Sequence, residues 1–246
     1  MFIRDSAAVF HHAVRATFRT KAGVLIGAVQ PLLYLALLGP LLARAVPGGG
    51  GWEVVVPGIL LQLVLMSAGL AGFGVVFDRQ TGVLERLRVT PASRAALLTG
   101  RVLRDALVLV AQSALILALG FALGLRAPVA GVLAGLAFVL VPALGLAALS
   151  YAVALRLPPE VFPPVMTTAI VPLMLLSGVF LPMSMAPGWL DAVSRAMPLR
   201  YVVDAMRDLF AGHYATGSVG IGLAVSVVFL AVALAAGTRA FQRESA

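Results

Sequence analysis

The chain has 246 residues, of which 61% are hydrophobic and 11% are charged, and its formal net charge is +8. Average soluble domains carry about 25% charged residues, so this composition excludes a water-soluble fold and predicts an all-α integral membrane protein. The absence of cysteine excludes disulfide scaffolds, thiol nucleophiles and thiolate metal sites.

The N-terminal segment predicts an amphipathic helix that lies in the headgroup region of the membrane. Phe10, Val14 and Phe18 recur every four residues, and basic side chains fall on another face. The neighbouring His11 and His12 do not face one another on such a helix and have no third ligand nearby, so we expect no metal site.

Six intervals without Asp, Glu, Lys or Arg predict six transmembrane helices. A hydrocarbon core about 30 Å thick needs roughly 20 apolar residues at helical rise. The spans are expected at about 22–43, 54–77, 106–125, 128–155, 161–181 and 218–238. Little chain remains outside them, and we therefore expect residues 1–246 to form one transmembrane domain.

The basic residues predict the orientation of these spans. Thirteen of the 18 Lys and Arg residues fall in the two termini and in the loops that follow the second and fourth spans. Cytoplasmic loops accumulate basic residues, so both termini are expected in the cytoplasm. No basic stripe is interleaved with stacking aromatic residues, and we expect no nucleic-acid partner.

The inner loop 78–105 predicts a short amphipathic helix that ends near Pro91. Val83, Leu84 and Leu87 fall on one helical face, and charged residues fall on the others. Such a helix can dock on a partner. A solvated loop whose arginines only fix the topology is the alternative, and contact with anionic lipid is compatible with either.

The outer segment before the last span predicts several short helices. Pro182, Pro187 and Pro198 break any single helix, and the pieces between them mix apolar with charged residues. Short helices that re-enter the outer leaflet would account for this mixture, with Trp189 and Tyr201 at the interface. A proline-rich loop is the alternative.

Two ordered motifs stand in the two long loops. The inner motif is the stretch from Gly82 to Pro91. The outer motif comprises Gly178, Pro182, Pro187, Leu190, Pro198, Tyr201 and Arg207. These motifs resemble those of the type 2 permeases of ATP-binding-cassette (ABC) exporters, particularly the daunorubicin-resistance type. The resemblance covers nearly the whole chain, including the six spans and both long loops.

The resemblance implies that a separate subunit hydrolyses ATP. The chain contains no Gly-x-x-x-x-Gly-Lys-Ser/Thr phosphate loop, so ATP and Mg²⁺ are expected on two copies of a partner ATP-binding subunit. No catalytic residue or bound cofactor is expected in this chain. By resemblance, a coupling helix at 79–91 would contact that subunit through Arg79, Gly82, Val83, Leu84, Glu85, Arg86, Leu87, Arg88, Thr90 and Pro91.

The resemblance also implies a second permease chain, in a homodimer or a heterodimer, with the pathway between the two chains. The first, second and fifth spans would line this pathway. They offer Gln30, Tyr34, Gln62, Met66, Phe73, Thr167, Thr168 and Met174 as polar and soft apolar candidates. Hydrogen bonding and packing within one subunit are the alternative role for each of these residues.

The expected function is ATP-driven export of a hydrophobic drug, an antibiotic or a lipid-like molecule from a bacterial cell, through a multi-pass permease in its membrane. Export of a polysaccharide or glycolipid is the main alternative. A pathway for long sugars should be lined with aromatic and polar groups, so the low aromatic content of 7% favours an apolar cargo. A non-transporting scaffold is a further alternative. An ion-coupled carrier is disfavoured because the six intervals contain no ionisable residue.

Overall fold

The computed structural model describes residues 21–46, 51–81 and 94–243, and the regular elements in these ranges are all helical. A helix satisfies its backbone hydrogen bonds internally, which the interior of a bilayer requires. The all-α prediction is confirmed for this part of the chain.

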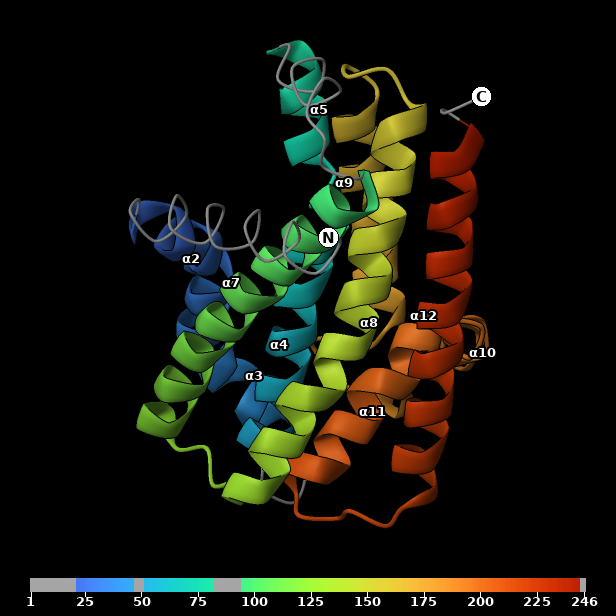
Figure 1. Cartoon of the computed structure of the whole chain (residues 1–246). Coiled ribbons are helices and arrows are strands. Elements are labelled where there is room, and N and C mark those ends of the chain that lie inside the picture. Colours follow the sequence, from blue (N-terminus) through green and yellow to red (C-terminus); the bar gives the residue numbers. More distant parts are fainter. Residues whose placement is uncertain (1–20, 47–50, 82–93, 244–246) are drawn as a thin grey trace.

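The helices are α2 (Lys21–Leu37), α3 (Gly39–Ala45), α4 (Gly51–Gly69), α5 (Phe73–Gln80), α7 (Arg94–Leu123), α8 (Val129–Arg156), α9 (Phe162–Leu176), α10 (Gly188–Ser194), α11 (Pro198–Phe210) and α12 (Gly217–Arg243), with the 3-10 turn η1 (Met183–Met185). The long helices α4, α7, α8 and α12 pack side by side into a bundle, and α11 crosses it obliquely (Figure 1). The connections before α8 and before α12 lie at one end of the bundle, and α5 and the end of α12 lie at the other (Figure 1).

Four stretches of the described chain are long and apolar enough to cross a membrane. They are Gly51–Phe77, Val102–Leu123, Val129–Arg156 and Gly217–Gly237. A fifth candidate is the pair Gly27–Leu37 and Gly39–Ala45, which is bent by 46°. All six predicted intervals contain helix, but length and composition support four to five spans, and the six-span topology and its orientation stay predictions.

The helix found within the predicted span 161–181 is shorter than that span. Its helix α9 has 15 residues, or roughly 22 Å at helical rise, which is less than the thickness of a hydrocarbon core. The helix ends at Leu176 because Gly178 adopts a left-handed φ of +70°, a conformation that glycine accommodates readily.

The third span begins earlier than the sequence indicated. Residues 94–105 were expected in a loop, but α7 begins at Arg94 and its apolar span begins at Val102. That expectation was wrong because it ended the loop at the last charged residue. The charge of Asp105 is instead accommodated inside the helical stretch by an ion pair with Arg104 and a hydrogen bond from the Tyr151 hydroxyl.

Helix α4 forms the centre of the core. From Val55 to Leu65 its residues are all buried, and it contacts α2, α3, α7, α8, α9 and α11. A helix that is apolar on all sides is stable only when other helices or lipid surround it, and here the other helices do so.

Glycines bring the backbones of neighbouring elements close to α4 and α8. A Cβ atom on Gly58 would lie 1.7 Å from the carbonyl oxygen of Val179, and one on Gly131 would lie 2.0 Å from that of Leu209. Small residues permit such close helix packing in membrane proteins. The turn after α9 thus packs directly against α4, and the end of α11 packs directly against α8.

We expect Gly58→Ala to destabilise the protein by about 1 to 3 kcal/mol, because the new methyl group would clash with backbone that cannot rotate away. Thermal unfolding of the purified chain in detergent measures the effect. Gly220→Ala on α12 is the control, since a Cβ atom there meets nothing within 4 Å. Equal melting temperatures for the two variants would contradict the close approach at Gly58.

Candidate functional site

The outer motif builds a set of short helices that we call the outer cap, residues 178–210. Pro182 precedes η1, Pro187 precedes α10, and Pro198 is the first residue of α11. The carbonyl of Pro187 accepts the backbone N–H groups of Leu190 and Asp191 at 2.9 and 3.1 Å. The prolines therefore mark the starts of helices, where their missing N–H costs nothing, and the predicted short helices are present.

Arg207 joins the outer cap to the central helix. Its side chain is 8% exposed. Nη2 donates to the carbonyl of Gly178 at 2.6 Å, Nε donates to the carbonyl of Val54 at 3.1 Å, and Nη1 pairs with Asp204 at 3.2 Å. A buried guanidinium is tolerated when its donors are satisfied in this way. One side chain thus fastens α11 to the start of α4 and to the end of α9.

A second polar cluster fastens α10 to α11. Asp191 forms ion pairs with Arg195 and with Arg200, each at 2.7 Å, and the Tyr201 hydroxyl donates to the carbonyl of Arg195 at 2.9 Å. The hydrogen bond from Arg195 is the main cause that holds the pKa of Asp191 below its ordinary value, and the Arg200 side chain acts in the same direction. Asp191 is therefore the charged centre of this cluster.

At the other end of the bundle, Arg79 fastens α5 to α8. Its guanidinium donates to the carbonyls of Ala154 and Leu155 at 3.1 and 2.6 Å. These carbonyls belong to the last turn of α8, where a cation is favourable. Arg79 is the one described member of the predicted coupling set. The others, Gly82, Val83, Leu84, Glu85, Arg86, Leu87, Arg88, Thr90 and Pro91, lie outside the described residues, as does the amphipathic segment 1–20.

The break between α4 and α5 is held by a serine of α8. The Ser150 hydroxyl donates to the carbonyl of Gly69 at 2.6 Å and accepts the N–H of Gly72 at 2.9 Å. A Cβ atom on Gly72 would lie 2.5 Å from the backbone oxygen of Ser150, so only glycine fits there. Together, Ser150 and Arg79 position the segment that leads into the inner loop.

The predicted pathway residues do not gather around one cavity within the described part of the chain. Some side chains are exposed (Gln30, Phe73, Thr167 and Thr168), some are half-buried (Tyr34 and Met66), and two are buried (Gln62 and Met174). Two of the aromatic rings pack edge to face, Tyr34 on Phe180 and Phe73 on Phe162. Of the exposed members, Gln30 lies on α2 and Thr167 and Thr168 lie on α9, and both helices contact α4.

Gln62 is fully buried, and neither its amide nitrogen nor its amide oxygen has a hydrogen-bond partner in the described structure. Gln62 shares a face of α4 with Gly58 and Gly69. A Cβ atom on Gly58 would lie nearest to Val179, and a Cβ atom on Gly69 would lie nearest to Ile170. The end of α9 and the turn after it therefore cover this face. An unsatisfied buried amide costs about 1 to 3 kcal/mol, which makes Gln62 unusual among the core residues.

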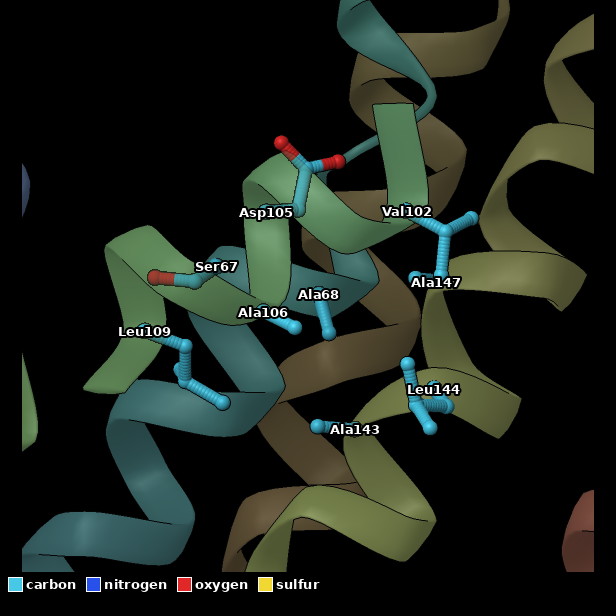
Figure 2. A pocket seen from close by; sticks show the side chains of 9 residues that line it. All are labelled: Ser67, Ala68, Val102, Asp105, Ala106, Leu109, Ala143, Leu144 and Ala147. Atoms are coloured by element: carbon cyan, nitrogen blue, oxygen red, sulfur yellow. The ribbon is translucent and has the colours of Figure 1, made fainter. Parts of the chain in front are cut away.

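A pocket between α4, α7 and α8 was not predicted. It is lined by Ser67, Ala68, Val102, Asp105, Ala106, Leu109, Ala143, Leu144 and Ala147 (Figure 2). Its walls are mostly alanine and leucine, and the carboxylate of Asp105 lies at the rim and points away from them (Figure 2). Val102, Ala106 and Leu109 recur at helical spacing on both sides of Asp105. This spacing is the sequence signal that could have placed one apolar face of α7 here.

Candidate metal ligands are not clustered in the described residues. Within 21–46, 51–81 and 94–243, no group of three or more His, Cys, Asp or Glu side chains comes together. The polar side chains of the outer cap bond to backbone carbonyls and to one another, and Arg79 bonds to backbone carbonyls of α8. These side chains therefore position helices.

Apolar helices of spanning length, with polar cross-links at both ends of the bundle, define a multi-pass membrane protein. Residues 7–211 match the family model described as "ABC-2 type transporter". The chain therefore belongs to the ABC-2 type transporter family of membrane permeases, whose domain is a non-catalytic transmembrane subunit. The predicted family is confirmed, and the roles of the individual motif residues stay predictions.

The chain is similar in sequence to two permeases with named roles in drug resistance. The chain is 29% identical over 183 residues to the daunorubicin resistance ABC transporter permease protein DrrB1 of Streptomyces coeruleorubidus, an alignment of 73% of this chain and 65% of that relative. It is 28% identical over 194 residues to a "probable doxorubicin resistance ABC transporter permease protein DrrC" of Mycobacterium tuberculosis, an alignment of 76% of this chain and 70% of that relative. The chain thus spans about two thirds of the length of these relatives.

We expect Arg207→Gln to lower the stability of the protein by about 3 kcal/mol, because Asp204 and two backbone carbonyls lose a charged donor. Thermal unfolding in detergent measures the loss. Arg195→Gln in the same outer cap is the matched control, since Arg195 is exposed and bonds to a single carboxylate. A control that lost as much as Arg207→Gln would show that burial of Arg207 is not the cause.

Replacing Arg79 by Gln should loosen α5 from α8. The backbone amides of α5 are expected to exchange roughly ten-fold faster in hydrogen–deuterium exchange, because the last carbonyls of α8 lose their cationic partner. Arg156→Gln removes an exposed arginine from the same end of α8 and should leave α5 unchanged. Unaltered exchange in Arg79→Gln would remove the anchoring role.

Proposed function

We propose that this chain is the permease subunit of an ATP-driven ABC exporter in a bacterial cell membrane. Two permease chains, identical or different, would pair with two copies of a separate ATP-binding subunit that carries ATP and Mg²⁺. The chain would cross the membrane six times with both termini in the cytoplasm. Family membership supports the class of transporter, and the distribution of basic residues supports the orientation.

The observation that carries the coupling mechanism is the attachment of α5 to α8. Arg79 ties the end of α5 to the last turn of the long helix α8, and Ser150 of α8 bonds to Gly72 just before α5. Residues 79 and 80 of the proposed coupling segment 79–91 are the end of α5, so movement of this segment by the ATP-binding subunit would displace α5 and the inner end of α8 together. Val83, Leu84 and Leu87 would supply the apolar contacts, and Glu85, Arg86 and Arg88 the polar ones.

The transport pathway would lie between the two permease chains. The exposed polar side chains Gln30, Thr167 and Thr168 lie on α2 and α9, which supports a pathway-facing surface on these helices. Thr167 bonds to the carbonyls of Pro163 and Pro164 in its own helix, so its hydroxyl is satisfied without water. Such a surface suits an apolar molecule.

The cargo would be a hydrophobic drug, an antibiotic or a lipid-like molecule taken from the cytoplasm or the inner leaflet. One of the two relatives is named for daunorubicin resistance and the other for probable doxorubicin resistance, which supports export of a drug. The apolar and exposed side chains Val29, Leu33, Val165 and Val171 on α2 and α9 support it from the structure.

The coupling role is tested by replacing Glu85 with Arg and Arg86 with Glu in separate variants. Each change reverses a charge on the proposed contact, and we expect at least a roughly five-fold loss of copurified ATP-binding subunit and of cargo-stimulated ATP hydrolysis. Arg156→Glu in the other inner loop is the control and should retain both. Unchanged copurification and hydrolysis in the two test variants would overturn the coupling role.

The proposed orientation is tested with topology reporters. A fluorescent protein fused after Thr90 should be active in the cytoplasm, and alkaline phosphatase fused at the same position should be inactive. Fusions after Thr216, between α11 and α12, are expected to give the opposite pair of results. An active phosphatase at Thr90 would overturn both the orientation and the coupling mechanism.

A further inference from the structure

The pocket between α4, α7 and α8 is a gap in the packing of three helices. Ala68, Ala106, Ala143 and Ala147 line it, and their short side chains leave space between the helices (Figure 2). Protein interiors contain few gaps larger than a water molecule. A larger gap between apolar spans therefore indicates that a molecule from outside the chain completes the packing here.

The lining of this pocket favours an apolar group over water. Of the lining residues, only Ser67 and Asp105 have polar side chains. The Ser67 hydroxyl donates to the side-chain oxygen of Gln112 at 3.2 Å, and the carboxylate of Asp105 points away from the walls (Figure 2). A buried water makes about three hydrogen bonds, whereas cavities with apolar walls stay dry.

The size of the pocket suits a single acyl chain. With its open mouth the pocket measures about 280 Å³, and pockets that enclose a drug-sized molecule measure about 300 to 1,000 Å³. Along α7 the lining extends from Val102 to Leu109, or roughly 10 Å at helical rise, and the hydrocarbon of one leaflet is about 15 Å thick. The pocket is therefore long enough for much of one acyl chain and too small for a whole drug.

Arg104 and Asp105 place an ion pair at the depth where headgroups meet acyl chains. The apolar span of α7 begins at Val102, so both residues lie in its first turn. Arg104 Nε donates to Asp105 at 2.9 Å, and Asp105 accepts the hydroxyl of Tyr151, a buried residue of α8. These bonds hold the guanidinium in place while 33% of the Arg104 side chain stays exposed. An arginine fixed at this depth favours a phosphate group.

We propose that the pocket binds one acyl chain of a membrane phospholipid whose phosphate contacts Arg104. The ligand is a lipid of the bilayer and is distinct from the transported cargo. Ala68 directly precedes Gly69, whose carbonyl accepts the Ser150 hydroxyl. The bound chain therefore packs beside the break between α4 and α5. Under the proposed orientation this lipid belongs to the inner leaflet, and the site itself does not depend on transport.

Photo-crosslinking of the purified full-length chain in detergent tests the site. The probe is phosphatidylethanolamine with a diazirine on one acyl chain, and mass spectrometry locates the crosslinks. We expect crosslinks at Ala143 and Ala147 to exceed those at Val227 and Val228 on the exposed face of α12 by roughly five-fold, because a bound lipid dissociates more slowly than a loosely associated one. Unlabelled phosphatidylethanolamine should compete, and diacylglycerol with the same chains should compete much less.

A matched pair of variants separates the pocket from the rest of α7. Ala106→Leu fills the pocket and should reduce the crosslinks to α8 by at least roughly five-fold. Ala114→Leu adds the same side chain at an exposed position of α7 and should retain them. Arg104→Gln leaves the walls unchanged and should raise the probe concentration for half-maximal crosslinking by roughly five-fold. It keeps the proposal testable if Ala106→Leu does not fold.

Three results would overturn the proposal. Crosslinks as frequent on α12 as at the pocket would indicate ordinary lipid contact along the whole surface. Equal loss of crosslinks in Ala106→Leu and Ala114→Leu would show that the pocket is not the binding site. Equal competition by diacylglycerol and phosphatidylethanolamine would exclude recognition of the phosphate by Arg104. The experiment contains no ATP, cargo or ATP-binding subunit, so its failure is distinct from failure of the proposed transport function.

Discussion

Every interruption of a helix inside an apolar bundle frees backbone carbonyl and N–H groups that must find partners. This chain supplies the partners from side chains of other elements. Arg207 bonds to Gly178 after α9, Ser150 bonds to both sides of the break between α4 and α5, and Arg79 bonds to the last turn of α8. These three side chains therefore supply hydrogen bonds at places where helices break or end.

These cross-links make α4 and α8 the common supports of both ends of the molecule. At the end that carries the outer cap, α4 accepts Arg207 at Val54 and packs against the Val179 backbone, and α8 packs through Gly131 against α11. At the other end, α8 bonds to both ends of α5 and to the last residue of α4. A displacement of α5 therefore acts on the two helices that also carry the outer cap, without passing through a flexible connection among the described elements.

The sequence predicted the features that depend on local composition. Uncharged intervals located helix in all six places, and Pro182, Pro187 and Pro198 correctly marked the divided outer segment. The features that depend on distant partners were not predictable in this way. Asp105 was assigned to a loop because its partner Tyr151 is 46 positions away. The end of α9 at Leu176 was missed for another reason, because Gly178 is a local signal for a helix end that the uncharged interval did not take into account.

Gln62 and Asp105 show why polarity within a span does not by itself identify a transport site. Asp105 is paired with Arg104 and Tyr151 and needs no further partner to be stable. Gln62 is covered by the end of α9 and its turn, and its amide is left unsatisfied at a cost of about 1 to 3 kcal/mol. Burial and polarity alone therefore do not distinguish a residue of the pathway from a residue that packs within one chain.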